Sequence, residues 1–136
     1  MNISFGMIFS IILIIIFLAF GFYAITKFLD LQKSIQVEKF LSDLQEDIDK
    51  MWKSPQGSQT ITYTLPTNII SVCFKTDEFQ NLEFNSKKLV GGENIENIDI
   101  ASMTNQESPY CIPNIKGRVS IVLKKDYGET LVRITR

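Results

Sequence analysis

The first 53 residues of the chain change from an unbroken apolar run to a helical alternation of apolar and polar positions. Residues 7–25 read MIFSIILIIIFLAFGFYAI and are apolar apart from one serine and one glycine. Lys27 carries the first charged side chain, and no Gly or Pro stands between Gly21 and Pro55 to interrupt a helix. The pattern therefore predicts one near-continuous helix over residues 7–52, about 70 Å long at about 1.5 Å per residue.

The apolar run is long enough to cross a membrane. About 19 residues of helix span the hydrocarbon core of a bilayer, which is about 30 Å thick. A cleaved secretory signal fits less well, because the run has no basic segment before it, is too long, and has no A-x-A site after it. We therefore expect residues 1–26 to be a retained single-pass transmembrane segment in contact with membrane lipid, and residues 27–53 to form an amphipathic helical rod.

Where the membrane run ends, the apolar positions of the helix fall on two nearly opposite faces. At about 100° per residue, the first stripe consists of Ala24, Phe28, Leu31 and Ile35. The second stripe consists of Val37, Phe40, Leu41, Leu44, Ile48, Met51 and Trp52. A helix that packs against one partner has one apolar face. Two apolar faces therefore favour two packing partners. A bend near residues 34–36 that turns both stripes onto one core is the alternative.

The second stripe is wide and adjoins the rest of the chain. We expect five of its residues to pack against the chain's own β domain, namely Val37, Leu41, Leu44, Ile48 and Trp52. The first stripe is continuous with the membrane run. We therefore expect this stripe to pack against other subunits or other membrane proteins, through Ala24, Phe28, Leu31 and Ile35. In the monomer we expect Phe28, Leu31 and Ile35 to remain uncovered.

From Thr60 the apolar period changes from helical to alternating. The segment TITYTLP alternates apolar residues with threonines, which is typical of a half-buried strand. The next run, IISVCFK, is predicted as a strand with Ile70, Val72 and Phe74 on one face and Cys73 on the other.

Shorter apolar segments and a final hairpin around residues 126–129 bring the total to about six or seven short strands, mainly antiparallel. Residues 103–117 are polar and rich in proline, and are predicted as an irregular loop. The fold class that follows is α+β, with a long N-terminal transmembrane and amphipathic helix followed by a small antiparallel β domain over residues 58–136.

The two cysteines, Cys73 and Cys111, both lie in the β domain. One disulfide formed in an oxidising compartment accounts for them, and two buried free thiols are the alternative. Orientation is ambiguous from the charges, because Lys27, Lys33 and Lys39 follow the apolar run and the positive-inside rule then favours a cytoplasmic β domain. The cysteine pair and the strand-rich domain favour the outside, which we adopt.

Composition argues against catalysis and nucleic-acid binding. The chain has no His, and 14 Lys and Arg against 15 Asp and Glu give a net charge of −1. No P-loop, GxGxxG, GxSxG, CxxC or HExxH motif occurs. The acidic residues Asp43, Glu46, Asp47 and Asp49 are predicted as a solvated helix face rather than a calcium site. We expect no enzyme activity, no catalytic residues, no cofactor, no metal and no nucleic-acid partner.

This layout resembles type IV filament subunits, the pilins, and especially archaeal pilin-like proteins. In that family the first half of a long N-terminal helix spans the membrane, and a compact β-rich head, often with a disulfide, packs on the second half. The resemblance implies a possible processing site between Gly6 and Met7, just before the apolar run. The leader MNISFG departs from the family in having no basic residue, and Ile11 stands where many bacterial pilins have a glutamate.

The resemblance implies a structural subunit of a type IV pilus-like surface filament, anchored in the membrane through its N-terminal helix before assembly. The expected partners are membrane lipid and further copies of the chain in a helical homo-oligomer, or other membrane proteins. The expected location is the membrane, with an extracytoplasmic head, and the cell surface after assembly. The alternative is a non-polymerising, single-pass anchored β domain that acts as an accessory, stator or binding module.

Overall fold

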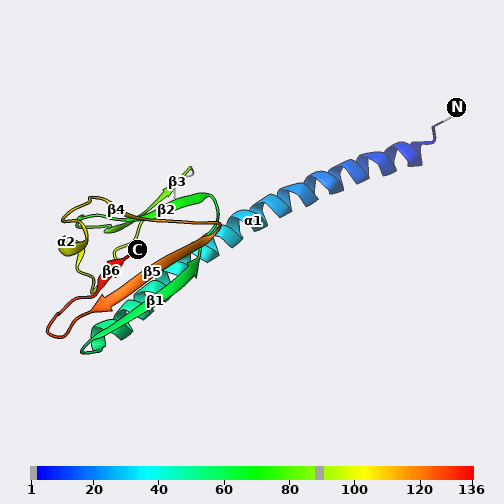
Figure 1. The fold of residues 1–136 in the computed structure, drawn as a ribbon. Helices are drawn as coiled ribbons and strands as arrows, with labels where there is room; N and C mark the ends of the chain where they lie inside the picture. Colours follow the sequence, from blue (N-terminus) through cyan, green and yellow to red (C-terminus); the bar gives the residue numbers. More distant parts are fainter. Residues whose placement is uncertain (1–2, 88–90) are drawn as a thin grey trace. The chain divides into compact units, whose positions relative to one another are not determined.

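One long helix, α1 (Phe5–Lys53), precedes all the strands in the computed structural model, which describes residues 3–87 and 91–136 (Figure 1). The predicted helix over residues 7–52 is confirmed, and so is the α+β class with antiparallel strands after the helix. The chain divides into two compact units, an N-terminal unit of residues 1–35 and a C-terminal unit of residues 36–136. The division falls where the apolar stripe of the helix changes face.

The strands of the C-terminal unit form two three-stranded antiparallel sheets (Figure 1). The first sheet has the strand order β1-β5-β6 and consists of β1 (Gly57–Thr64), β5 (Arg118–Lys125) and β6 (Arg133–Thr135). The second has the order β3-β2-β4 and consists of β3 (Leu82–Ser86), β2 (Ile69–Phe74) and β4 (Tyr110–Pro113). A single helical turn, α2 (Ile100–Met103), lies between β3 and β4, and Asp99 caps it by accepting a hydrogen bond from the Ser102 backbone N–H.

Alternation in the sequence explains the first sheet. Along β5, Val119, Ile121 and Leu123 are fully buried, and the residues between them point outward or are half-buried. Tyr63 of β1 pairs with Val119, and Ile61 pairs with Ile121, so apolar side chains of the two strands share one face. The predicted final hairpin is confirmed as the β5–β6 pair.

The second sheet departs from the predicted pattern in two places. The register between β2 and β3 shifts between Ile69 and Ser71, and this bulge turns Ile69 into the core and leaves Ile70 exposed. The prediction that Ile70 shares the buried face of Val72 was therefore wrong. The predicted irregular loop was also wrong in part, because Tyr110–Pro113 forms β4 beside β2.

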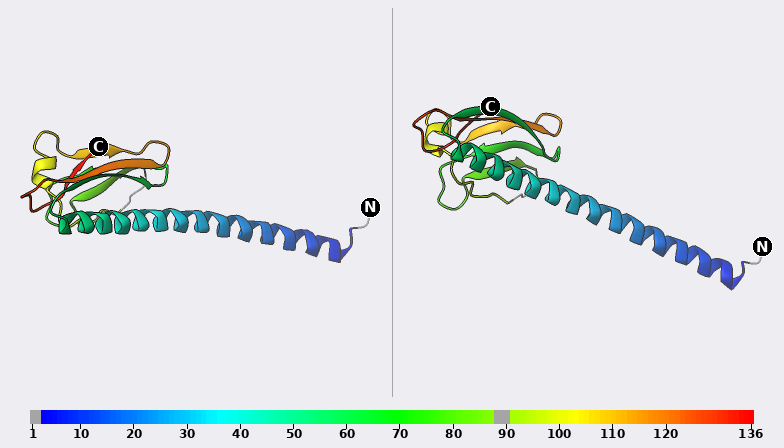
Figure 2. Two further views of the ribbon diagram at one scale, coloured as in Figure 1. Left: turned by 60° about the horizontal axis from the view of Figure 1, so that its bottom comes forward. Right: turned by 90° about the horizontal axis from the view of Figure 1, so that it is seen from below.

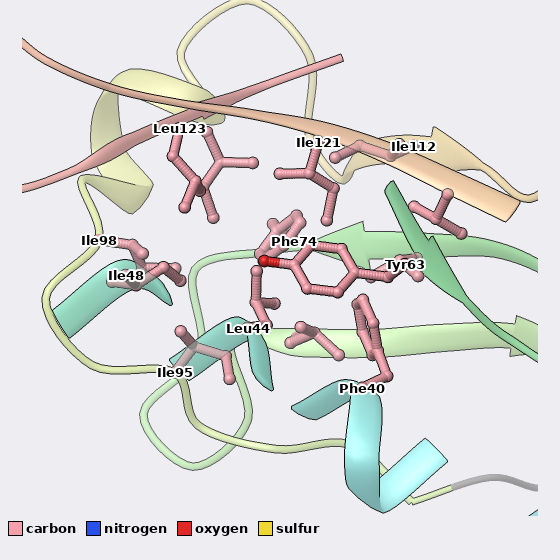
Figure 3. Close-up of a cluster of buried hydrophobic side chains, with 14 of the residues drawn as sticks. Phe40, Leu44, Ile48, Tyr63, Phe74, Ile95, Ile98, Ile112, Ile121 and Leu123 are labelled. Carbon is pink, nitrogen blue, oxygen red and sulfur yellow. The ribbon is translucent and has the colours of Figure 1, made fainter. Parts of the chain in front are cut away.

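One hydrophobic core joins residues 36–53 of α1 to both sheets, and Figure 2 shows both sheets on the same side of this part of the helix. The helix contributes Phe40, Leu44, Ile48 and Met51. Figure 3 shows Leu44 and Phe40 converging with side chains of β1, β2 and β5, including Tyr63, Phe74 and Ile121. The ring of Phe40 packs edge-on against Tyr63, with 5.2 Å between ring centroids.

Of the five residues assigned to this interface from the sequence, Leu44 and Ile48 are fully buried, and Val37 and Leu41 are partly buried against the core. The prediction for Trp52 was wrong, since its side chain is 41% exposed.

The helical repeat explains the exposure of Trp52. At 100° per residue Trp52 lies roughly 80° around the helix from Leu44, whereas Met51 lies only about 20° away and continues the buried line. Met51 also lies beneath the start of β1, where a Cβ added to Gly57 would come within 2.9 Å of its sulfur.

We expect Leu44→Ala to lower the free energy of unfolding of the C-terminal unit by about 2–5 kcal/mol, because it leaves a cavity in a fully packed site. Leu31→Ala removes the same atoms from an exposed position and should leave the unfolding free energy nearly unchanged. Denaturant titration of the full chain in detergent micelles, followed by near-ultraviolet circular dichroism, measures both. Equal losses for the two variants would mean that both stripes serve one core.

Candidate functional site

The candidate functional surface is the outside of α1 in the N-terminal unit. This helix is long and apolar enough to cross a membrane, and every described residue of the N-terminal unit is exposed. Residues 5–26 carry no charged side chain, and as a helix they measure about 33 Å, close to the thickness of a hydrocarbon core. The structure thus has one membrane-compatible helix among its described residues.

The few polar side chains near this run are already partnered. The Ser10 hydroxyl donates to the Gly6 carbonyl at 2.9 Å, and the Thr26 hydroxyl donates to the Tyr23 carbonyl at 2.8 Å. Such bonds lower the cost of placing a hydroxyl in hydrocarbon. At the end of the run the Lys27 ammonium lies 5.6 Å from the centre of the Tyr23 ring, and this amphipathic pair suits the interface between lipid and water.

The first stripe continues the apolar surface past Lys27. Ala24 is exposed, and the side chains of Phe28, Leu31 and Ile35 are 64%, 57% and 53% exposed. In this single chain these residues are uncovered, as the sequence pattern predicted. Large apolar side chains clustered on one helix face are typical of a surface that binds a partner.

The residues proposed for processing lie in the first turn of α1. The backbone N–H of Met7 donates to the carbonyl and the hydroxyl of Ser4, at 3.0 and 3.3 Å, so Ser4 caps the helix. Gly6 is exposed, and a Cβ placed on it would meet nothing within 4 Å. Both residues are exposed and lie within the helix, and cleavage of the bond between Gly6 and Met7 stays a prediction.

In the C-terminal unit, polar groups on the last turns of α1 attach the strands and loops to the helix. The Gln45 side chain both accepts from the Glu96 backbone N–H at 2.9 Å and donates to the Glu96 carbonyl at 3.2 Å. The Asn97 amide donates to Asp49 at 2.9 Å. The Tyr63 hydroxyl donates to Asp47 at 2.7 Å.

The end of α1 is fixed by a buried lysine. Lys125, in the last position of β5, donates from Nζ to the carbonyls of Trp52 and Ser54, at 2.6 and 2.9 Å. These carbonyls belong to the unsatisfied groups at a helix C-terminus, where a positive charge is favourable. The bonds tie β5 to the point where the helix gives way to β1.

These contacts correct the interpretation of the acidic residues as a purely solvated face. Asp47 and Asp49 accept hydrogen bonds from the β strands and loops, whereas Glu46 lies outside and pairs with Lys50 at 3.2 Å. Within residues 3–87 and 91–136 no three His, Cys, Asp or Glu side chains gather as metal ligands. Sequence patterns did not reveal Gln45 and Lys125, because their partners are far away in the chain.

Cys73 and Cys111 form a disulfide, as one of the two sequence-based alternatives predicted. They are direct partners across β2 and β4, with 4.0 Å between their Cα atoms, and the bond closes a loop of 38 residues. Arg136 holds the same strand by donating to the Cys111 carbonyl at 2.8 Å and by packing over the Tyr110 ring, 5.0 Å from its centre. β4 is thus fastened both covalently and by hydrogen bonds.

Comparison of the chain with protein-family models, with curated proteins and with solved structures finds no match.

We expect Tyr63→Phe to lower the unfolding free energy by about 1.5–3 kcal/mol at neutral pH, since it removes a hydrogen bond to a charged carboxylate. Burial, and then the hydrogen bond to Asp47, raises the pKa of Tyr63 above its usual value near 10. The hydroxyl therefore stabilises the fold below pH 10 and loses this effect as the pH rises further. The difference between wild type and variant should shrink above pH 10.

Denaturant titration between pH 7 and pH 11 measures this difference. Tyr127→Phe is the matched control, because the Tyr127 side chain is 83% exposed. Removing its hydroxyl should change neither the unfolding free energy nor its dependence on pH. A gap between wild type and Tyr63→Phe that stays constant up to pH 11 would contradict the assignment.

The disulfide gives a test of which side of the membrane the C-terminal unit occupies. We expect both cysteines to resist alkylation in native membranes until a reductant is added, because the oxidising side of the membrane preserves the bond. Mass spectrometry of alkylated peptides measures this. If both thiols react without reductant, the C-terminal unit faces the reducing compartment and the predicted orientation is wrong.

Proposed function

We propose that this protein is a structural subunit of a type IV pilus-like surface filament, held in the membrane by its N-terminal helix before assembly. In this proposal the chain crosses the membrane once, with the C-terminal unit outside the cytoplasm. The function is structural rather than catalytic. Its partners are membrane lipid before assembly and identical chains in the filament.

The observation that carries the proposal is the exposed first stripe. A simple membrane anchor needs apolar side chains only where lipid surrounds it. Here the apolar surface extends past Lys27 along one helix face to Ile35, where the polar faces of the helix already contain charged residues. Helix-on-helix packing with further copies would cover this stripe and the membrane run together.

The separation of the two stripes supports the same function. The second stripe is used inside the chain, because its central residues are buried in the core of the C-terminal unit. The first stripe remains available, so assembly requires no rearrangement of that core. The disulfide and the hydrogen bonds to residues 45–54 keep the C-terminal unit intact outside the cell.

Shearing of cells, followed by electron microscopy and mass spectrometry of the released fraction, tests the proposal. We expect filaments that contain this chain, and we expect Phe28→Ala to reduce their yield because it removes an apolar contact between subunits. Phe79→Ala is the matched control, since Phe79 is also exposed but lies on the C-terminal unit.

The N-terminal peptide of the sheared material tests processing in the same experiment, with Met7 as the expected first residue. Chains that remain in the membrane fraction, with no filaments in wild type, would favour the non-polymerising anchored β domain instead. Equal filament yields for Phe28→Ala and wild type would contradict the proposal that the first stripe packs between subunits.

A further inference from the structure

We propose that one end of the C-terminal unit docks on the surface of an anionic lipid bilayer. This surface, the basic end, is defined by three exposed cations and two exposed isoleucines, namely Lys87, Lys116, Arg118, Ile70 and Ile115. The inference depends on the anchoring helix and not on polymerisation.

Strand pairing brings the segments of the basic end together. β1 ends where β5 begins, at the pair Thr64 and Arg118, and β2 begins where β3 ends, at Ile69 and Ser86 (Figure 1). The backbone N–H of Asn114 donates to the Ile70 carbonyl at 2.9 Å, which places the connection between β4 and β5 beside the start of β2.

Side-chain bonds join the same connections. The Asn114 amide donates to the carbonyls of Pro66 and Ile69, at 3.0 and 2.8 Å, and the Leu65 backbone N–H donates to the Gly117 carbonyl at 2.9 Å. The basic end is therefore one ordered surface built from neighbouring turns.

The strand and turn segments of the basic end carry charges of one sign, whereas α1 brings both Lys39 and Asp43 beside the end of β1. Residues 57–76 and 108–125, which supply most of it, contain no Asp or Glu. Among the described residues, none of Lys87, Lys116 and Arg118 forms an ion pair, whereas Lys75, Arg133 and Arg136 elsewhere on the unit are paired with carboxylates. Unpaired cations next to exposed isoleucines match the anionic headgroups and the adjoining apolar layer of a bilayer.

Lys116 occupies a backbone conformation that disfavours a lysine. It has a φ of 54° and is followed by Gly117 with a φ of 83°, in a two-residue turn closed by hydrogen bonds between Ile115 and Arg118. Such turns prefer Asn, Asp or Gly in their first central position. A lysine here costs conformational energy. Binding of its ammonium group to an anionic headgroup would account for a lysine at this position.

The path of the chain favours the chain's own membrane as the occupant. The helix joins the C-terminal unit at Gln36, and Phe40, one turn later, packs on Tyr63, which is next to the last residue of β1 at the basic end. Gln36 lies nine positions after Lys27, a rise of about 14 Å in a helix. The covalent connection to the membrane run therefore reaches the unit at the basic end and keeps the local lipid concentration high.

Fluorescence quenching by brominated lipid in nanodiscs tests the proposal on the full chain. The natural tryptophan, Trp52, reports on the opposite end, because its carbonyl is bound by Lys125 at the far end of β5. The double variant Trp52→Phe/Ile115→Trp reports on the basic end at a position that is 65% exposed and tolerates a larger side chain. Nanodiscs contain brominated phosphatidylcholine, either alone or mixed equally with phosphatidylglycerol.

We expect strong quenching of the basic-end reporter only with phosphatidylglycerol, and weak quenching of Trp52 in both lipids. In the basic-end reporter background, Lys87→Gln/Lys116→Gln/Arg118→Gln should lower the ratio of docked to undocked molecules about a hundredfold, at about fivefold for each cation. Lys50→Gln/Lys53→Gln/Lys124→Gln in the same background changes the net charge equally but at other positions, and should leave quenching unchanged.

Near-ultraviolet circular dichroism checks that each variant is folded. Absence of quenching at the basic end, equal quenching of both reporters, or quenching independent of phosphatidylglycerol would each overturn the inference. None of these outcomes bears on filament yield, so a failure here is distinct from a failure of the proposed function.

Discussion

The structure depends on one packing arrangement, in which Phe40, Leu44 and Ile48 of α1 fill the core of a unit whose other walls are two small sheets. Among the described residues each sheet has three strands, so neither can bury much apolar surface without the helix. The same backbone must carry an apolar run that suits lipid. A continuous helix satisfies both demands because its side chains can change face between Ile35 and Val37 without any break in its hydrogen bonds.

Polar contacts determine where along the helix the strands attach. Gln45, Asp47 and Asp49 fix the lateral position of the loop at residues 96–97 and of β1, while Lys125 fixes the helix end. Each bond joins elements far apart in the chain. The bonds of Asp47, Asp49 and Lys125 are partly buried at the margin of the apolar core, which strengthens them, whereas those of Gln45 are exposed. Apolar packing therefore supplies most of the stability, and these bonds select one position of the strands and loops along α1.

Local patterns predicted what depends on local physics. The helix, the change of stripe and the alternation in β1 and β5 follow from side-chain periodicity, and the structure has them. The bulge that exposes Ile70 and the strand at Tyr110–Pro113 depend on pairing with other strands, which no local pattern encodes. Trp52 lay at the edge of its stripe, where a small angular difference decides burial. The partners of Gln45 and Lys125 stand 51 and 73 residues away, beyond the reach of any periodicity.

The boundary between the two units has a consequence for proteolysis. Every buried core residue of the described chain lies at or after Phe40. A cut just before Gln36 would therefore free a fragment that retains the whole core, the disulfide and the lysine at the helix end. A cut a few turns later would remove the helical wall of the core and leave the sheets without a common partner. The chain thus has one short stretch, just before Gln36, at which a protease would separate the apolar run from an intact C-terminal unit.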